Sequence, residues 1–258
     1  ITVNYNNQAG LEKTIASVIC QIFNDFEYII IDGGSTDLSV DVIKQYFDQI
    51  DYWVSEKDSG IYNAMNKGIK VTKGEYIIFL NSGDVFTDRN TLNTCKKYID
   101  SNPSADVFYG DIWGTQPRVK EPWLHCHPEK IDLFFLEHQN LNHQSAIFKT
   151  SLFADLGLYP KKYCLAGDHW LFLKAFVGNK KFVHIPEPLV VYDYGGQSTT
   201  QREKYVAEMA CIWNEEVPAY VKEIMTKYKA LEDANKMRLV KLARSIHSKY
   251  NRLRKIAF

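Results

Sequence analysis

The sequence has no apolar run approaching the roughly 18 residues that a membrane-spanning helix needs. It also has no excess of charge, because 31 Lys and Arg residues balance 31 Asp and Glu residues, so the composition gives no sign of nucleic-acid binding. Disorder is excluded as the dominant state, since 45% of the residues are hydrophobic. A chain of 258 residues can bury a full core, either as one large α/β domain or as a domain with a helical appendage.

Cysteine is sparse, with no C-x-x-C pair among Cys20, Cys95, Cys126, Cys164 and Cys211. This argues against a disulfide framework and favours a reducing compartment, so we expect a cytoplasmic protein. His125 and His127 would share a strand face, but no third ligand nearby completes a zinc site. The chain opens on an apolar run without an initial methionine or a signal peptide, and we expect a few native residues to precede it.

Two phosphate-binding fingerprints are also missing. Neither G-x-G-x-x-G nor G-x-x-x-x-G-K-[ST] follows any of the expected strands. Their absence disfavours a hydride-transfer enzyme and a P-loop NTPase.

Short apolar runs alternate with helical patterns over the first hundred residues. The runs are at 1–5, 27–32, 51–54 and 75–80. Between them apolar residues recur at helical spacing, as at Leu11, Ile15 and Val18. Strands that alternate with helices predict a mainly parallel sheet covered on both faces. Further strands and a helix over 167–178 follow, and from about 200 the chain is helical with a break near Pro218.

Polar or acidic groups follow each of the four strands, at Asn4–Asn7, Asp32–Asp37, Glu56–Gly60 and Asn81–Asp84. Ligands of open α/β sheets bind beyond the carboxyl ends of the strands. The four segments therefore predict one binding crevice.

Each segment also has a purely structural interpretation. Ser35 to Asp37 can cap the next helix, but Asp32 lies before the cap and could accept a hydrogen bond from a nucleobase or ribose. Lys67 is either a surface lysine or a cation near a diphosphate. Asn-Ser-Gly-Asp at 81–84 is either a tight turn or, through Asp84, part of a site for Mg²⁺ or Mn²⁺.

Five motifs occur in a characteristic order: TVNYNN, IDGGSTD, EKDSGIYNAMNKGI, KGEYIIFLNSGD and AGDHWLFLK. With them the sequence resembles a family 2 glycosyltransferase of the GT-A fold, of the bacterial surface-polysaccharide type, over roughly residues 1–200. The resemblance implies an α/β fold with a mainly parallel central sheet. It also implies inverting transfer of a sugar from a nucleotide-sugar, with UDP-linked hexoses expected on family grounds, to an acceptor hydroxyl.

The resemblance further implies roles for particular residues. The base and ribose would be held by Thr2, Val3, Asn4 and Asp32, and the nucleotide would also be touched by Asp58 and Lys67. The family's metal-binding D-x-D element, which holds Mn²⁺ or Mg²⁺ through the donor diphosphate, falls on Asn81, Ser82, Gly83 and Asp84.

Two departures from the family pattern stand out. Gly33 replaces the second acid of the usual pair after the second strand, and Asp84 is the one strong metal ligand left in its cluster.

Asp168 is the candidate general base, which must lie within hydrogen-bond reach of the acceptor hydroxyl. It opens a helical run in GDHWL, where the resemblance places the family's acidic motif. The alternative is a helix-terminal Asp stabilised by the macrodipole by about 0.3–1 kcal/mol. The helix N-terminus should lower the pKa of Asp168 and keep it ionised. Asp111 could face the donor sugar or acceptor, and His143 either orients substrate or makes a structural hydrogen bond.

We expect a GT-A domain over 1–200, with a nucleotide-binding half over about 1–104 and an acceptor half over about 105–200, followed by a helical extension over 201–258. The stretch 241–258 has six basic residues, no acid and one apolar stripe. It suits an anionic membrane surface, at the inner face of the plasma membrane, where a glycan acceptor would be lipid-linked. It equally suits packing on the main domain or on a second copy in a homodimer.

Two other classes stay open. A sugar-nucleotide-forming nucleotidyltransferase generally carries a glycine-rich, basic loop after its first strand, whereas NNQAGLEK has one glycine and no basic cluster. A non-catalytic nucleotide-sugar-binding relative would explain the thinned acidic cluster.

Overall fold

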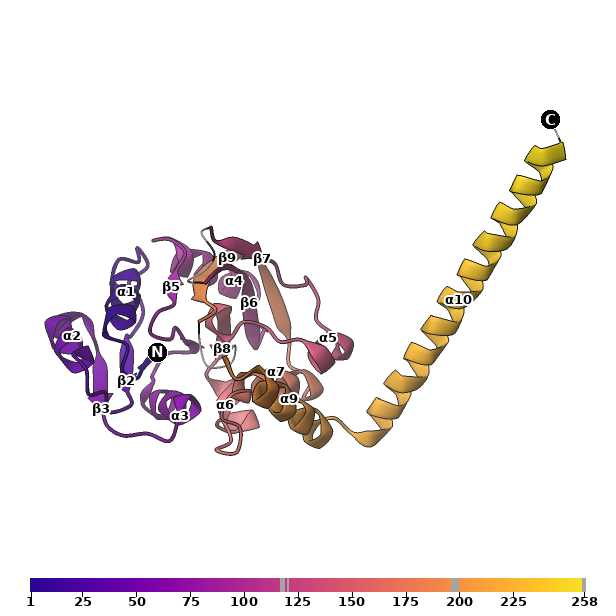
Figure 1. Cartoon of the computed structure of the whole chain (residues 1–258). Helices are drawn as coiled ribbons and strands as arrows, with labels where there is room; N and C mark the ends of the chain where they lie inside the picture. Colours follow the sequence, from indigo (N-terminus) through magenta and orange to yellow (C-terminus); the bar gives the residue numbers. More distant parts are fainter. Residues whose placement is uncertain (117–118, 120, 196–199, 257–258) are drawn as a thin grey trace. The chain divides into compact units, whose positions relative to one another are not determined.

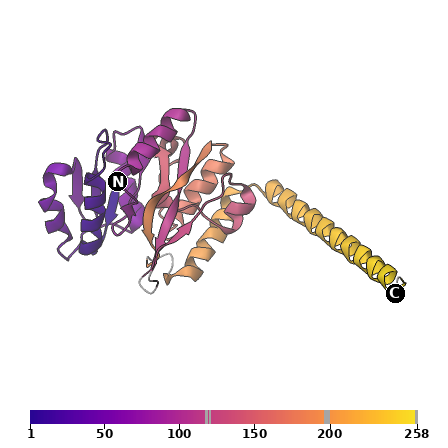
Figure 2. The same cartoon turned by 90° about the horizontal axis from the view of Figure 1, so that it is seen from above.

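The computed structural model describes residues 1–116, 119, 121–195 and 200–256, with the backbone alone for 240 and 242–256. The chain forms two compact units, Ile1–Glu216 and Val217–Phe258. The first unit carries the sheets and is seen from two directions in Figures 1 and 2.

The first three strands form the parallel sheet that the alternating pattern predicts. They are β1 (Thr2–Asn4), β2 (Ile29–Asp32) and β3 (Tyr52–Ser55), in the order β1-β2-β3. The helices α1 (Gln8–Ile19), α2 (Ser39–Gln45) and α3 (Ile61–Val71) and a short 3₁₀ helix (Phe47–Gln49) connect them and lead onward (Figure 1). In register, Asn4 lies beside Asp32, and Asp32 beside Ser55. The carboxyl ends of all three strands therefore meet at one edge.

The second sheet is mixed, so the expectation of a mainly parallel sheet holds for the N-terminal half only. Its order is β4 (Tyr76–Ile78), β8 (Ala146–Lys149), β6 (Val107–Thr115), β9 (Phe182–Asp193) and β5 (Val85–Phe86), with β7 (Trp123–His125) on β6. Among the strand pairs of this sheet that the structure describes, only β6–β9 is parallel.

The two sheets are joined beside β1. Leu80 N donates to Ile1 O at 2.9 Å and Ser82 N to Val3 O at 3.1 Å, so the segment after β4 runs parallel to β1. This brings the fourth polar segment to the same edge as the first three.

The remaining elements of the first unit are α4 (Thr91–Ser101), α5 (Leu133–His138), a 3₁₀ helix (His143–Ser145), α6 (Ser151–Leu156), α7 (Gly167–Val177) and α9 (Arg202–Glu216). Two expected late strands are in fact one, β9, because the β6 register shifts around Asp111 and accommodates Pro186 and Pro188. Proline has no N–H to donate to the neighbouring strand, and at such a bulge the strand pairing does not require that hydrogen bond.

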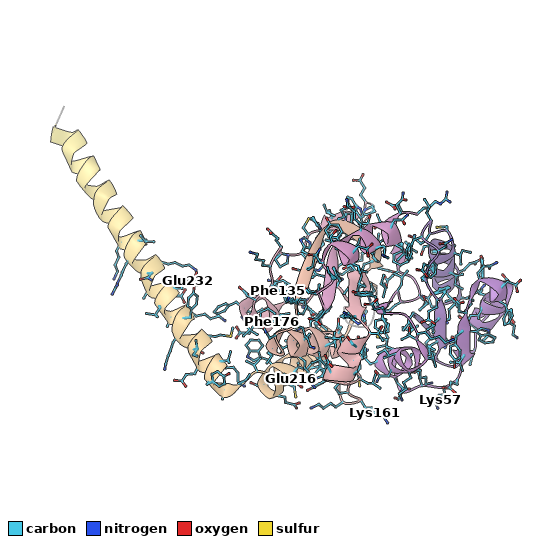
Figure 3. All side chains as sticks on the ribbon, turned by 180° about the vertical axis from the view of Figure 1, so that it is seen from behind. Lys57, Phe135, Lys161, Phe176, Glu216 and Glu232 are labelled. Atoms are coloured by element: carbon cyan, nitrogen blue, oxygen red, sulfur yellow. The ribbon has the colours of Figure 1, made fainter. Side chains whose placement is uncertain are left out.

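The boundary expected near residue 200 lies later, at Glu216. The helix α9 packs on α7, and Trp170 Nε1 donates to the Glu216 carboxylate at 2.8 Å, while Tyr163 donates to Glu215 at 2.8 Å. The chain then breaks at Pro218, as predicted, before α10 (Ala219–Ile256). Figure 3 labels Glu216 on α9 and Glu232 on α10.

Burial follows the apolar runs. Ile29, Ile30 and Ile31 are all at most 1% exposed, as expected of a strand covered on both faces. A second core region gathers aromatic rings, among them Phe79, Phe148 and Phe172. Within the part of the chain that the structure describes, no helix has the length and apolar character that crossing a membrane requires.

Candidate active site

The four polar segments are tied to one another by hydrogen bonds. The third segment joins the second through the backbone, where Glu56 N donates to the Asp32 carbonyl at 3.0 Å, and side chains make the other links. Asn4 Nδ2 donates to Asp32 Oδ1 at 2.7 Å, linking the first segment to the second. Asn6 N donates to Ser35 Oγ at 2.8 Å and Asn7 Nδ2 to the Ser82 carbonyl at 2.9 Å, which adds the fourth segment. The convergence inferred from strand order is therefore built into the loops themselves.

Asp32 is fully buried and its carboxylate is saturated. Oδ1 accepts from Asn4 and Ser35, and Oδ2 accepts from Ser55 Oγ at 2.6 Å and from the backbone N–H groups of Gly34 and Ser35. Burial alone would raise the pKa of Asp32, but the hydrogen bonds from Ser35, Ser55 and Asn4 outweigh it and lower the pKa. Asp32 therefore holds the loops together, and its carboxylate is not accessible to a nucleobase.

The other predicted residues of the first strand are also buried. Thr2 is 0% exposed with its hydroxyl 3.1 Å from that of Tyr28, and Val3 and Asn4 are 5% and 4% exposed. Their side chains belong to the core and to the Asp32 network, so a ligand would meet the residues that follow them.

Tyr5 comes directly after these residues, and it was not among the predicted site residues. Its side chain is 63% exposed at the end of β1, and its Cδ2 atom lies 3.3 Å from the Cβ position at Gly33. The signal was an aromatic residue in a polar strand-end segment.

Asp58 and Lys67 lie on the third segment and on α3. Asp58 Oδ1 accepts from Gly60 N at 2.9 Å, so Asp58 shapes the turn before α3. Lys67 Nζ is 2.9 Å from Glu56 Oε1, with the lysine side chain 23% exposed. The structure therefore gives Lys67 an anionic partner at the loop, rather than a free surface position.

Asp84 is 5% exposed, and its Oδ1 accepts from Asp193 N at 3.1 Å. Burial, reinforced by the charge of Asp193, raises the pKa of Asp84 to about 8. Gly83 has a φ of 109°, which only glycine adopts easily, and Ser82 is held by Asn7. The 81–84 segment is thus the tight turn and an acid-bearing strand end at once.

The residues of this segment fit a hard cation. Asn81 Oδ1 is a buried oxygen with no hydrogen-bond partner in the described part of the chain, and Asp84 supplies a carboxylate. Among the described residues no group of three His, Cys, Asp or Glu side chains could hold a metal by itself. A divalent ion here would need oxygen ligands from a bound diphosphate as well.

Asp168 opens α7 and is held on both oxygens. Oδ1 accepts from Tyr62 Oη at 3.0 Å and from His169 N at 2.9 Å, and Oδ2 accepts from Asn140 Nδ2 at 2.9 Å. Burial raises the pKa of Asp168 to about 6, although these three donors oppose the rise. The expectation of a lowered pKa is therefore wrong, because desolvation exceeds the effect of the helix terminus.

The helix α9 supports this acid from behind, which the sequence did not reveal. The Glu208 carboxylate accepts from Cys164 N, Leu165 N and Ala166 N at 3.2, 2.8 and 3.0 Å, immediately before α7. Asn140 also lies 3.4 Å from the Tyr205 hydroxyl. The expected C-terminal extension thus begins with a helix that fixes the candidate base.

Asp111 and His143 have structural partners. Asp111, 5% exposed, accepts from His127 N and lies 2.9 Å from His184 Nε2, which fixes the turn after β7. His143 is 3% exposed, stacks on Phe79 and lies 2.6 Å from the Tyr159 hydroxyl. The structural alternative weighed for His143 is the one that this packing supports.

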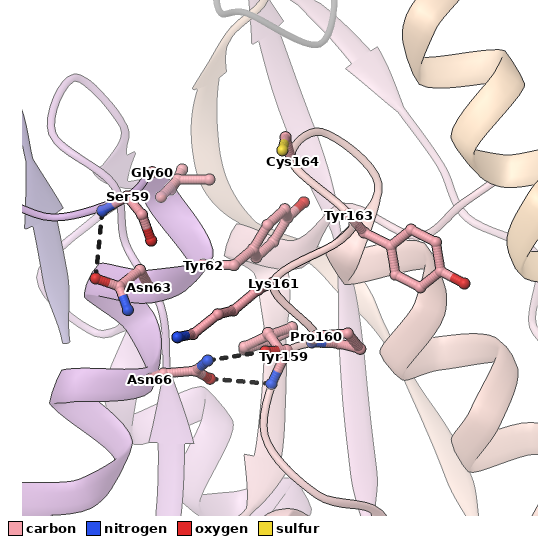
Figure 4. Close-up of a pocket in the computed structure, with 11 residues that line it drawn as sticks. Ser59, Gly60, Tyr62, Asn63, Asn66, Tyr159, Pro160, Lys161, Tyr163 and Cys164 are labelled. Carbon is pink, nitrogen blue, oxygen red and sulfur yellow. Dashed lines mark hydrogen bonds between the residues drawn. The ribbon is translucent and has the colours of Figure 1, made fainter.

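A small, open pocket adjoins the third segment (Figure 4). It is lined by Ser59, Gly60 and Tyr62 on one side and by Lys161 and Tyr163 on the other. Its rim shares Tyr62 with the Asp168 site, but Asp32, Asp84 and Asp168 do not line it. The pocket is therefore a neighbour of the candidate site rather than its centre.

The fold and the converging loops define a GT-A-type sugar transferase, and the chain belongs to glycosyl transferase family 2, whose model matches residues 1–157. An uncharacterized glycosyltransferase of Mycobacterium tuberculosis is 31% identical over 179 residues, 68% of this chain and 67% of that protein. A PGL/p-HBAD biosynthesis glycosyltransferase of Mycobacterium bovis is 28% identical over 205 residues, covering 77% and 78%. The resemblance inferred from the motifs is confirmed.

Solved structures show the same fold. Staphylococcus aureus TarS 1–349 in complex with UDP-GlcNAc superposes with a TM-score of 0.66 at 17% identity, over 86% of this chain and 68% of that one. Mannosyltransferase PcManGT from Pyrobaculum calidifontis, in complex with GDP-Man and Mn²⁺, superposes with a TM-score of 0.62 at 16% identity. The match covers 79% of this chain and 59% of that one. The predicted GT-A architecture is confirmed.

Proposed function

We propose that the protein transfers a sugar from a nucleotide-sugar, with a UDP-sugar as the favoured donor, to an acceptor hydroxyl with inversion, in the synthesis of a bacterial cell-surface glycan. The observation that carries the proposal is the hydrogen-bonded meeting of the four strand-end loops, together with an acid, Asp168, that is held by Tyr62 of α3, the helix that follows the third loop. The relatives named for PGL/p-HBAD biosynthesis and the UDP-GlcNAc complex of TarS support this setting and this donor.

In this reaction the acceptor oxygen bonds to the anomeric carbon as the bond from that carbon to the phosphate oxygen breaks. The nucleoside diphosphate leaves with the electron pair, and the acceptor proton passes to the Asp168 carboxylate. Asp168 suits this role because its oxygens are fixed by Tyr62 and Asn140, and with a pKa of about 6 it is ionised at neutral pH and can accept a proton.

The donor would lie across the strand-end loops. The exposed ring of Tyr5 offers a face for the base, and Lys67 could exchange Glu56 for a phosphate oxygen. Asp32 acts beneath them by holding the loops together.

We assign Mn²⁺ or Mg²⁺ to Asp84 and Asn81, with the donor diphosphate completing the coordination. When bound, the cation supplies positive charge that stabilises the departing diphosphate. The complex of PcManGT with GDP-Man and Mn²⁺ supports this assignment.

The second unit bears on the acceptor. In the first half of α10, basic residues pair with acidic ones, as in Lys227–Glu223 and Lys236–Glu232. The stretch 241–258 contains six Lys and Arg residues and no acidic residue. We assign this end to an anionic membrane that holds a lipid-linked acceptor. Replacing Arg252, Arg254 and Lys255 by Gln should weaken binding to phosphatidylglycerol vesicles and leave the small binding to phosphatidylcholine unchanged. Unaltered vesicle binding, or loss of dimers instead, would favour the homodimer helix.

The direct test of the function is a donor panel. UDP-, GDP- and dTDP-sugars are added with Mn²⁺ or with EDTA, and thermal unfolding and nucleoside diphosphate release are followed. A donor at 100 times its Kd should stabilise the fold by about 2.7 kcal/mol, and slow metal-dependent release of the diphosphate should accompany it. Pyrophosphate release from a nucleoside triphosphate and a sugar-1-phosphate would identify a nucleotidyltransferase. Donor binding without any turnover would identify a non-catalytic relative.

A further inference from the structure

Gly33 stands where the family pattern has a second acid, and the backbone does not require a glycine there. The neighbouring Gly34 has a φ of 79°, in the left-handed region that favours glycine. The φ angle of Gly33, in contrast, is not positive. The reason for a missing side chain at 33 must therefore be sought in its surroundings.

Those surroundings are a carboxylate and an aromatic ring. A Cβ atom at Gly33 would lie 2.7 Å from Asp58 Oδ2 and 3.2 Å from Asp58 Cγ, so the Asp58 carboxyl group would have to move to admit it, and 3.3 Å from Tyr5 Cδ2. Asp58 thus occupies the space that a side chain at 33 would need. A carboxyl group from the loop after β3 therefore lies over the backbone of the loop after β2.

The Asp58 carboxyl has one oxygen engaged and one available. Oδ1 accepts from Gly60 N, which fixes the orientation of the group. Oδ2 accepts no hydrogen bond from the part of the chain that the structure describes, and Asp58 is half-buried. The neighbouring Asp32, in contrast, is saturated by the protein.

We infer that Asp58 supplies, in place of the acid absent at 33, the carboxylate that reads the nucleobase of the donor. Oδ2 accepts from the ring N–H that uracil, thymine and guanine present on their pairing edge, while Tyr5 stacks on the face of the ring. Cytosine has a lone pair at the same ring position and would meet the carboxylate unfavourably. The inference rests on the proposed function, since it names the base-recognising group of the proposed donor site.

The test is binding of UDP, N3-methyl-UDP, CDP and GDP with Mn²⁺, measured by calorimetry on the full chain. The wild-type protein should prefer UDP or GDP over CDP and N3-methyl-UDP by about tenfold to a hundredfold, the range of a hydrogen bond to a charged group. Whichever of UDP and GDP binds more tightly identifies the base. Asp58→Asn keeps an oxygen for Gly60 N but should lose most of the preference.

A relocation variant makes the test sharper. Asp58→Ala removes the obstruction at 33, so Asp58→Ala with Gly33→Asp returns a carboxylate to the same space from the other loop and should restore the preference at least in part. Gly33→Asp alone should impair binding, because two carboxylates then compete for one space. The matched control is Glu12→Gln, which removes an acidic charge at an exposed position of α1 and should leave the preference unchanged.

The outcomes separate the two claims. An unchanged preference in Asp58→Asn overturns the inference while leaving the proposed function standing. An equal loss for all four nucleotides in that variant also overturns it, because Asp58 then acts on the ribose, the diphosphate or the fold. If the wild-type protein binds none of the four, the proposed function itself fails. Circular dichroism and thermal unfolding confirm that each variant is folded.

Discussion

The Tyr62 hydroxyl lies 3.0 Å from Asp168 Oδ1 and also 3.0 Å from the Leu165 carbonyl oxygen. A hydroxyl has one proton to donate, so it can serve only one of these acceptors at a time. When Asp168 is ionised, the hydroxyl can donate to it. When Asp168 is protonated, the hydroxyl can turn to Leu165. The helix that follows the donor loop is thereby coupled to the protonation state of the candidate base.

This coupling predicts the shape of the pH profile. The base must be ionised to accept a proton, and its pKa is about 6, so kcat should rise about tenfold per pH unit below pH 6 and level off above it. Initial rates between pH 5 and 9 at saturating donor and metal measure this. A rate that stays flat down to pH 5 would contradict the assignment.

Tyr62→Phe should move the same profile. Loss of a donor to the ionised carboxylate raises its pKa, so the acid limb should shift to higher pH by up to about one unit. Tyr159→Phe is the control, because its ring lies 5.1 Å from that of Tyr62 but its hydroxyl contacts His143 instead. A shift to lower pH, or equal shifts in both variants, would count against the coupling.

Metal binding should be linked to proton release at Asp84. Its pKa of about 8 means that the free protein holds a proton there at pH 7, which a bound cation must displace. The affinity for Mn²⁺ with UDP should therefore rise by about tenfold per pH unit up to pH 8. Calorimetry in buffers of different ionisation enthalpy detects the released proton. Asp84→Asn should abolish the release, and a pH-independent affinity in the wild type would exclude Asp84 as a ligand.

Glu208→Ala should impair transfer from a distance. It leaves three backbone N–H groups before α7 without their acceptor, which should lower the free energy of unfolding by about 1–3 kcal/mol. We expect a lower kcat with little change in the KM for donor. Glu203→Ala, at an exposed position on the same helix, is the comparison. Equal effects of the two variants would show that Glu208 does not position the base.

His169 should make the fold sensitive to acid. It is fully buried, neither ring nitrogen has a hydrogen-bond partner in the described part of the chain, and burial lowers its pKa to about 4. The unfolded chain takes up a proton below pH 6.5 while the folded one does not, so stability falls as pH falls. Between pH 7 and 5 this costs about 2 kcal/mol.

Denaturant unfolding of His169→Leu at both pH values isolates that contribution, because the variant should lose about 2 kcal/mol less than the wild type. His138→Leu, whose imidazole is 66% exposed, serves as the comparison. Identical pH dependence in wild type and His169→Leu would refute the role of His169.

Local pattern was sufficient to predict most of the fold and the place of the site. The strands at 29–32 and 76–78 and the helix over 167–177 follow from apolar runs and periodicity that tertiary contacts do not override. The meeting of the first three strand-end loops followed from the parallel order of β1 to β3, and the fourth joins them because the segment after β4 runs parallel to β1. The mixed character of the second sheet did not, because strand direction depends on connections whose lengths leave both directions open.

Side-chain roles were harder to predict, because they depend on contacts between distant segments. Asp32 and His143 carry the chemistry of a site but are enclosed by partners that sequence spacing does not reveal. The pKa of Asp168 was predicted in the wrong direction, since the burial produced by Tyr62, Asn140 and α9 has no local signature. Asp58 gained its significance only when its carboxyl was seen over Gly33.

The most direct measurement of the central claim compares Asp168→Asn with the wild type in donor binding and in sugar transfer, side by side. The account predicts that the variant binds the nucleotide-sugar and Mn²⁺ as the wild type does, while kcat for transfer falls by about 10²–10⁴-fold, the usual contribution of a general base. Transfer at an undiminished rate with intact donor binding would contradict the account, and the proton of the acceptor would then have to leave through another group.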